Sequence, residues 1–151
     1  MPADPWIDLL DLPGRGDDDG LLVAAAGEPW RAVDLFMGPD AESLTPRARI
    51  EIAATVGRLE APLHSGPTNR WDRRNTLVVR LEGQSPQSAG DLAVLGGANR
   101  IAVRAADGDL EIVQYRQAEL IGAEVWRLSG LLRGLGGSEA QAAAGAVTGA
   151  G

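Results

Sequence analysis

The stretch from residue 97 to residue 134 constrains the fold more than any other part of the chain, because it reads as consecutive β-hairpins. Apolar and polar residues alternate in the run 99–105, as they do in a half-buried strand. The dipeptide Asp107-Gly108 follows and predicts a type I′ turn, in which both central residues need a positive φ. The run 109–118 then returns as a partner strand, so the sequence predicts an antiparallel hairpin here.

A second hairpin is expected directly afterwards. The break at Gly122-Ala123 leads into the apolar run 124–132, which predicts a further strand. Upstream, short apolar or alternating segments predict strands at 1–12, 21–26, 30–37, 48–58 and 75–82. A short loop joins the strands expected at 21–26 and 30–37, so we expect these two to form a hairpin.

About eight short strands with turn signals between them, and no long helical pattern, predict an all-β fold. We expect an antiparallel β-sandwich or a barrel-like module at residues 1–134. Residues 135–151 are rich in glycine and alanine, with little to bury. We expect them to form a weakly ordered tail or a truncated element.

Charge and composition exclude several classes of partner. The net charge of −7 disfavours binding to nucleic acid, because the protein's field repels phosphates. No apolar run approaches the length of a membrane span, and aspartates stand where a signal peptide would be cationic, so we expect no membrane insertion. The chain has no cysteine, which excludes disulfides and thiolate metal sites.

No reactive constellation is visible either. The only histidine, His64, is followed by Ser65, but neighbouring residues of an extended chain point to opposite sides. The acidic loop at 13–20 lacks the ligand spacing of an EF-hand, and no pair of carboxylates stands out for glycoside cleavage. We therefore expect no enzyme activity, no metal site and no cofactor.

Tryptophan and arginine offer the one plausible binding chemistry. Exposed tryptophan stacks on sugar rings, and arginine binds carboxylates. Trp30, Trp71 and Trp126 could meet in a β-fold, and the segment 71–74 is the best candidate patch. The candidate ligand-binding residues are Trp30, Trp71, Asp72, Arg73 and Arg74. The alternative is that the tryptophans are buried and that the arginines pair with nearby acids.

Several motifs in fixed order carry a family resemblance. They are the segments NRWDRRN at 69–75, GAN at 97–99, ADG at 106–108, EIVQY at 111–115 and RLSGLLRG at 127–134. Together they resemble the C-terminal region of the long tail proteins of gene transfer agents and related siphophages. These are baseplate hub proteins, also described as phage tail or host specificity proteins.

The resemblance implies a structural and adhesive role at the tail tip of a virion or virion-like particle made in a bacterial cytoplasm. The expected partners are other tail and baseplate proteins, with a homotrimer in the intact assembly and a monomer for this chain alone. Family members are longer, and many carry a domain that resembles glycoside hydrolases, so this chain looks like an excised piece or a small relative. The alternative function is a module that binds a carbohydrate or receptor through exposed tryptophan and arginine.

Overall fold

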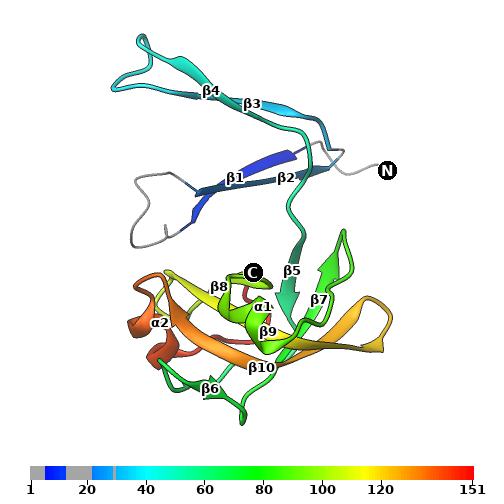
Figure 1. Cartoon of the computed structure of the whole chain (residues 1–151). Coiled ribbons are helices and arrows are strands. Elements are labelled where there is room, and N and C mark those ends of the chain that lie inside the picture. Colours follow the sequence, from blue (N-terminus) through cyan, green and yellow to red (C-terminus); the bar gives the residue numbers. More distant parts are fainter. Residues whose placement is uncertain (1–5, 13–21, 29) are drawn as a thin grey trace.

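The computed structural model describes residues 6–12, 22–28 and 30–151; the acidic loop expected at 13–20 lies outside the described residues. Antiparallel strands dominate the described part and form three sheets (Figure 1). The elements in chain order are β1 (Trp6–Leu12), β2 (Leu22–Glu28), β3 (Val33–Met37), β4 (Thr45–Ile50), β5 (Val56–Leu59), β6 (Trp71–Asp72), β7 (Leu77–Glu82), α1 (Asp91–Leu95), β8 (Arg100–Arg104), β9 (Leu110–Gly122), β10 (Val125–Leu135) and α2 (Glu139–Ala144). The predicted all-β class, with a barrel-like module, is confirmed.

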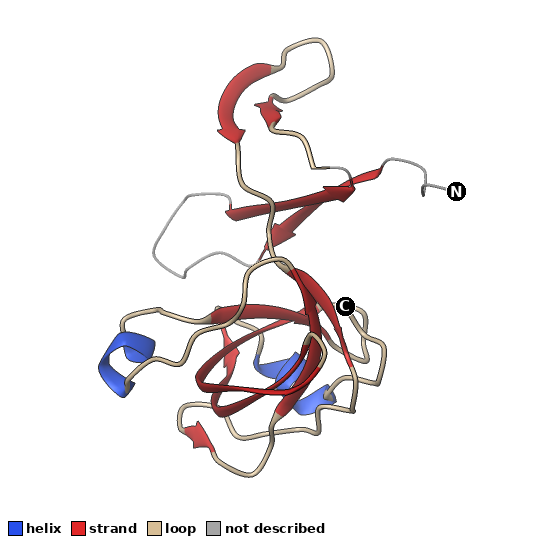
Figure 2. Cartoon of the chain, turned by 90° about the vertical axis from the view of Figure 1, so that its right-hand side faces the viewer, coloured by secondary structure: helices blue, strands red, loops and turns tan. Residues whose placement is uncertain are grey.

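The main sheet holds the hydrophobic core. Its strand order is β5-β7-β10-β9-β8, and the two-residue strand β6 pairs with the second half of β10. The sheet curls strongly on itself, so that its strands enclose an interior (Figure 2). Alternate side chains of the strands point into that interior, where the buried cluster contains Leu59, Leu63, Leu77, Val79, Val103, Val113, Tyr115, Leu128, Leu131 and Ala146.

Two short helices cover the outer face of β9. This explains why five consecutive β9 residues, 111–115, are buried although their side chains alternate between faces. On the outer face, the Gln114 side-chain amide donates hydrogen bonds to the carbonyls of Val94 and Ala98, at the end of α1. The Ser138 hydroxyl, next to α2, accepts the backbone N–H of Ile112 at 3.0 Å. No helix in the described residues is long and apolar enough to cross a membrane.

The hairpin predicted from Asp107-Gly108 is present, but its turn is of another type. β8 pairs with β9 in the register Ile101↔Val113, around a loop at 106–108. Gly108 has a φ of +93°, whereas Asp107 is not among the residues with positive φ, so the turn is not type I′. The Gly108 N–H bonds to the Ala105 carbonyl, which fits a type I turn closed by a glycine.

The pairing expected between 21–26 and 30–37 is wrong. β2 instead pairs with β1, and β3 pairs with β4. The turn that reverses the chain lies after β3, where Asp40 accepts a side-chain hydrogen bond from the Glu42 N–H and a backbone bond from the Ser43 N–H. This Asx-type turn brings β4 back along β3.

The strand expected at 48–58 is divided. β4 ends at Ile50 and β5 begins at Val56, so the alternating run passes from one sheet to another. Ile52, which belongs to the alternating run, lies in the connection and is 72% exposed. The Ala54 N–H bonds to the Ala25 carbonyl, which ties the connection to β2 and interrupts the strand.

The segment after β10 bridges the two outer strands of the main sheet. Leu63 and Ala146 exchange backbone hydrogen bonds, and Leu59 bonds with Gly149 and Ala150 on the β5 side. On the β8 side, the Arg104 N–H bonds to the Gly151 carbonyl at 2.8 Å. Glycine and alanine suit this role, because a Cβ at Gly145, where φ is +71°, would lie 2.7 Å from the Leu63 carbonyl oxygen.

Candidate functional site

A buried ion cluster lies beneath β6 and joins four distant parts of the chain. The Arg133 guanidinium, on β10, is 0% exposed and binds the Glu111 carboxylate in bidentate fashion at 2.6 and 3.0 Å. Its third nitrogen donates to the Asp72 carboxylate at 3.1 Å and to the His64 carbonyl at 3.0 Å. One buried cation thus faces two buried carboxylates, an arrangement that needs further hydrogen-bond donors.

Those donors come from the backbone and from Asn75. Asp72 accepts the N–H groups of Arg74 and Asn75 on one oxygen and the Asn75 side-chain amide on the other. Burial alone would raise the pKa of Asp72, but the hydrogen bonds from Asn75, Arg74 and Arg133 outweigh it and hold the pKa below its usual value. The Gly134 N–H donates to Glu111 at 3.1 Å.

Gly66 lets the chain pass close to this cluster. A Cβ at Gly66 would collide with the Arg133 guanidinium and with the Asp72 carboxylate. Glycine is therefore required here by the space available and not by backbone conformation. The loop histidine, His64, contributes only its carbonyl to the cluster, and its side chain is exposed together with Ser65.

Trp71 also belongs to β6, but its side chain lies on the face opposite the ion cluster and is half-buried. The Arg116 guanidinium covers its ring, at 5.3 Å from the ring centroid. Arg116 Nε also lies 2.6 Å from Asp91 Oδ1, but its N–H is not directed at that oxygen, so the pair is ionic without a hydrogen bond. One face of Trp71 is thus occupied by the protein's own cation and is closed to a stacking ligand.

The predicted binding residues do not form one surface. Asp72 is 1% exposed and belongs to the buried cluster. Arg73 and Arg74 are exposed, together with Arg70, and none of the three forms an ion pair within the described residues. The Trp30 indole N–H donates to the Glu51 carbonyl beside the β3–β4 hairpin, and that hairpin and β6 lie at opposite ends of the molecule (Figure 1).

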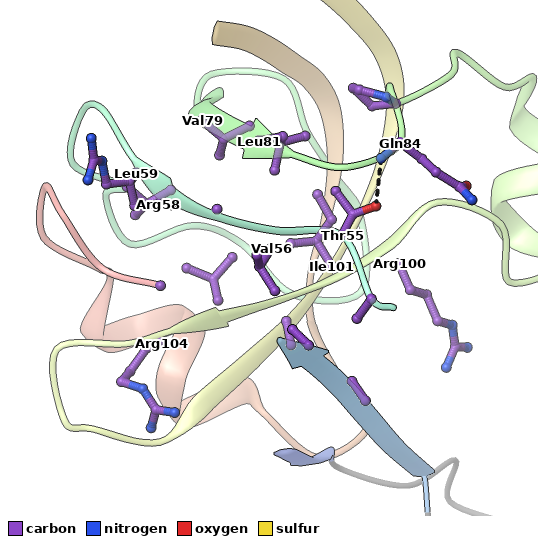
Figure 3. Close-up of a pocket in the computed structure, with 18 of the residues that line it drawn as sticks. Thr55, Val56, Arg58, Leu59, Val79, Leu81, Gln84, Arg100, Ile101 and Arg104 are labelled. Carbon is purple, nitrogen blue, oxygen red and sulfur yellow. Dashed lines mark hydrogen bonds between the residues drawn. The ribbon is translucent and has the colours of Figure 1, made fainter. Parts of the chain in front are cut away.

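A cavity of about 820 Å³ separates β2 from the mouth of the barrel (Figure 3). Aliphatic side chains line its inner part, and Figure 3 shows Val56, Leu81 and Ile101 there. The Gln84 N–H donates to the Thr55 hydroxyl at one end. Burial raises the pKa of Tyr115, another lining residue, against the opposing effect of a backbone hydrogen bond from Gln87.

The charged residues that line this cavity are all arginines. Arg58, Arg100 and Arg104 contribute to its walls, and no carboxylate side chain does so among the described residues. Arg100 and Arg104 extend away from the aliphatic interior (Figure 3). No group of three or more histidine, cysteine or carboxylate side chains that could hold a metal ion occurs in the described residues.

Residues that the sequence did not single out prove central to the ion cluster, namely Gly66, Glu111 and Arg133. A signal was present, because Glu111 and Arg133 lie in the motifs EIVQY and RLSGLLRG, which carry the family resemblance. The Asp72 and Asn75 partners lie in the third such motif, NRWDRRN. Three motifs that are separated in the sequence therefore meet at one buried point.

Comparison with known families gives a match, and comparison with curated proteins gives none. The matching family is described as Rcc01698-like, C-terminal, and its model covers residues 54–151. The name comes from a gene of the Rhodobacter capsulatus gene transfer agent. The match begins immediately before β5, so it covers the whole main sheet, both helices and the ion cluster.

Proposed function

Because the chain belongs to the Rcc01698-like, C-terminal family, we propose that it is a structural module of a baseplate hub in a phage-tail-like particle. In this proposal it sits at the tail tip, contributes to baseplate assembly and host-surface attachment, and performs no catalysis. The observation that carries the proposal is the family match over residues 54–151.

The structure supports a scaffold role for the matched region. The motif residues that form the ion cluster are enclosed: Arg133 is 0% exposed, and both of its carboxylate partners are 1% exposed. Groups held in this way are unavailable for turnover, but they lock β6, β9 and β10 together. A rigid module of this kind suits a position between neighbouring proteins in an assembly.

In the particle we propose a homotrimer that contacts other tail proteins, whereas the isolated chain is a monomer in dilute solution. Light scattering on the purified chain tests the second statement, and a stable trimer would refute it. The test of location is immunogold labelling of purified particles with an antibody against this chain. Label confined to one tail end supports the proposal, and particles that lack the chain altogether overturn it.

One observation favours a second candidate function, which is attachment to an acidic cell-surface polysaccharide. Arg70, Arg73 and Arg74 are exposed around β6 without an ion-pair partner in the described part of the chain. Guanidinium groups bind carboxylates and phosphates, and the uncovered part of Trp71 lies beside them. Titration with an acidic polysaccharide should change the tryptophan fluorescence, and replacing Arg73 and Arg74 by alanine should abolish that change. An unchanged spectrum across such polysaccharides would exclude this function.

A further inference from the structure

The outer edge of β8 offers unpaired backbone groups to the cavity. β8 is the last strand in the order β5-β7-β10-β9-β8. In an antiparallel pair, alternate residues bond to the neighbour and the remaining ones point away from it. The Asn99 carbonyl faces β9, because it accepts the Tyr115 N–H, whereas the Arg104 N–H faces outward to Gly151. By this alternation, the N–H and C=O groups of Arg100 and Ala102 also face outward.

The bridging segment covers only one end of that edge. Gly151 bonds to Arg104, and Leu59 on the opposite strand bonds to Gly149 and Ala150. Among the described residues no backbone partner faces Arg100 or Ala102, and both line the cavity. The barrel is therefore closed by an extended segment at one end of β8 and open at the other. An unpaired edge of this kind is a template for another strand.

The side chains around the open end define what kind of strand would fit. Ile101 and Val103 point into the aliphatic interior, where Val56 and Leu81 also line the cavity. Arg100 and Arg104, on the other face of β8, are exposed. A strand added beside β8 places alternate side chains on these two faces. Apolar side chains complement the first face, and acidic side chains complement the second.

We propose that the open edge of β8 binds an extended segment of a partner protein in which aliphatic and acidic residues alternate. The added strand pairs with the backbone of Arg100 and Ala102, and its aliphatic side chains fill the cavity between β2 and the barrel. The inference goes beyond the proposed function, since it concerns a surface of the isolated chain and requires no particle.

The test uses the full chain and a peptide probe of alternating valine and glutamate, acetylated and amidated at its ends. At low ionic strength, NMR titration should shift the backbone amide signals of Arg100 and Ala102 most strongly. At saturation the Ala102 amide should exchange with solvent about tenfold more slowly, because it becomes hydrogen-bonded. The same peptide with every backbone amide N-methylated has no N–H to donate to a strand edge and should not bind.

Charge is tested on both sides of the contact. A valine–lysine peptide should bind at least about tenfold more weakly, since it would place like charges beside Arg100 and Arg104. The variant Arg100→Glu should lower the affinity of the protein for the valine–glutamate peptide by a similar factor. Arg47→Glu on β4 makes the same charge change on an exposed residue that does not line the cavity, and it should leave binding unchanged.

Three results would overturn the proposal: no binding of the glutamate peptide, equal binding of its N-methylated form, or signal shifts that lie away from β8. Particle localisation is measured separately. If the peptide does not bind, the proposed structural role at the tail tip is unaffected. If the chain is absent from particles, the result on binding at the β8 edge is unaffected.

Discussion

Arg133 and Glu111 form a fully buried contact of the main sheet, a bidentate ion pair at 2.6 and 3.0 Å between β10 and β9. Their side chains are 0% and 1% exposed. In the register of these two strands Leu132 pairs with Gln114 and Leu135 pairs with Ile112, so the ladder is irregular at Arg133 and Gly134, beside the ion pair. The ion pair therefore lies at a β-bulge, where the regular pairing between β9 and β10 is interrupted.

Replacing Arg133 by methionine should destabilise the fold by about 3–5 kcal/mol, because it leaves Glu111 and Asp72 buried without their cation. Arg127→Met is the matched control: Arg127 pairs with Glu119 at 3.2 Å, and both side chains are substantially exposed. The Arg127→Met change should lower the free energy of unfolding by less than about 1 kcal/mol. Urea unfolding followed by tryptophan fluorescence measures both values. Equal losses of stability in the two variants would show that the buried cluster contributes no more to stability than an exposed ion pair.

Stability should fall on acidification partly through Asp72. The folded pKa of Asp72 lies below the value of about 3.9 that an unfolded aspartate has. A depressed pKa gives stability that is present above the unfolded pKa and is lost as the pH falls through the folded pKa. The free energy of unfolding of the wild type should therefore exceed that of Asp72→Asn by a constant amount near neutral pH. The excess should shrink below about pH 4. A difference that does not change with pH would contradict this assignment.

Local signals predicted the hairpins from 97 to 134 because each strand there pairs with its neighbour in the sequence. Turn residues and alternation are sufficient for such pairs: β8, β9 and β10 follow one another in the chain and in the sheet. The pairing expected for β2 is wrong for the same reason, because local signals favour the apolar run at 30–37, whereas β2 pairs with β1. β1 is also nearby, and the pattern alone does not distinguish the two.

The ion cluster could not be predicted from spacing, because its charges come from remote positions. Asp72 and Arg133 are 61 residues apart, and Glu111 and Arg133 are 22 apart. Nothing in the segment 71–74 distinguishes the buried Asp72 from the exposed Arg73 and Arg74 beside it. Only the fold, which lays β6 against the end of β10, determines which of these groups is buried.

Gly66→Ala should destabilise the fold by about 1–3 kcal/mol, because its methyl group would push into Arg133 and Asp72. Gly90→Ala is the control, since a Cβ at Gly90 meets nothing within 4 Å and its φ of −73° suits alanine. That variant should lower the free energy of unfolding by less than about 1 kcal/mol, because Gly90 is the N-cap of the short helix α1, where alanine is a poorer cap than glycine. Thermal unfolding of both proteins gives the comparison. A Gly66→Ala protein as stable as the control would mean that the cluster can shift freely.

Removing residues 146–151 should open the barrel between β5 and β8. The deletion takes away the backbone bonds of Leu63 with Ala146, of Leu59 with Gly149 and Ala150, and of Arg104 with Gly151. At about 1 kcal/mol for each hydrogen bond, the free energy of unfolding should fall by several kcal/mol. Val147→Ala changes the same segment at a side chain that is 62% exposed, so it should have little effect. Hydrogen exchange provides the decisive measurement, because the Arg104 and Leu59 amides should lose protection in the deletion and keep it in Val147→Ala. Unchanged protection of both amides in the deletion would show that the barrel holds without its bridging segment.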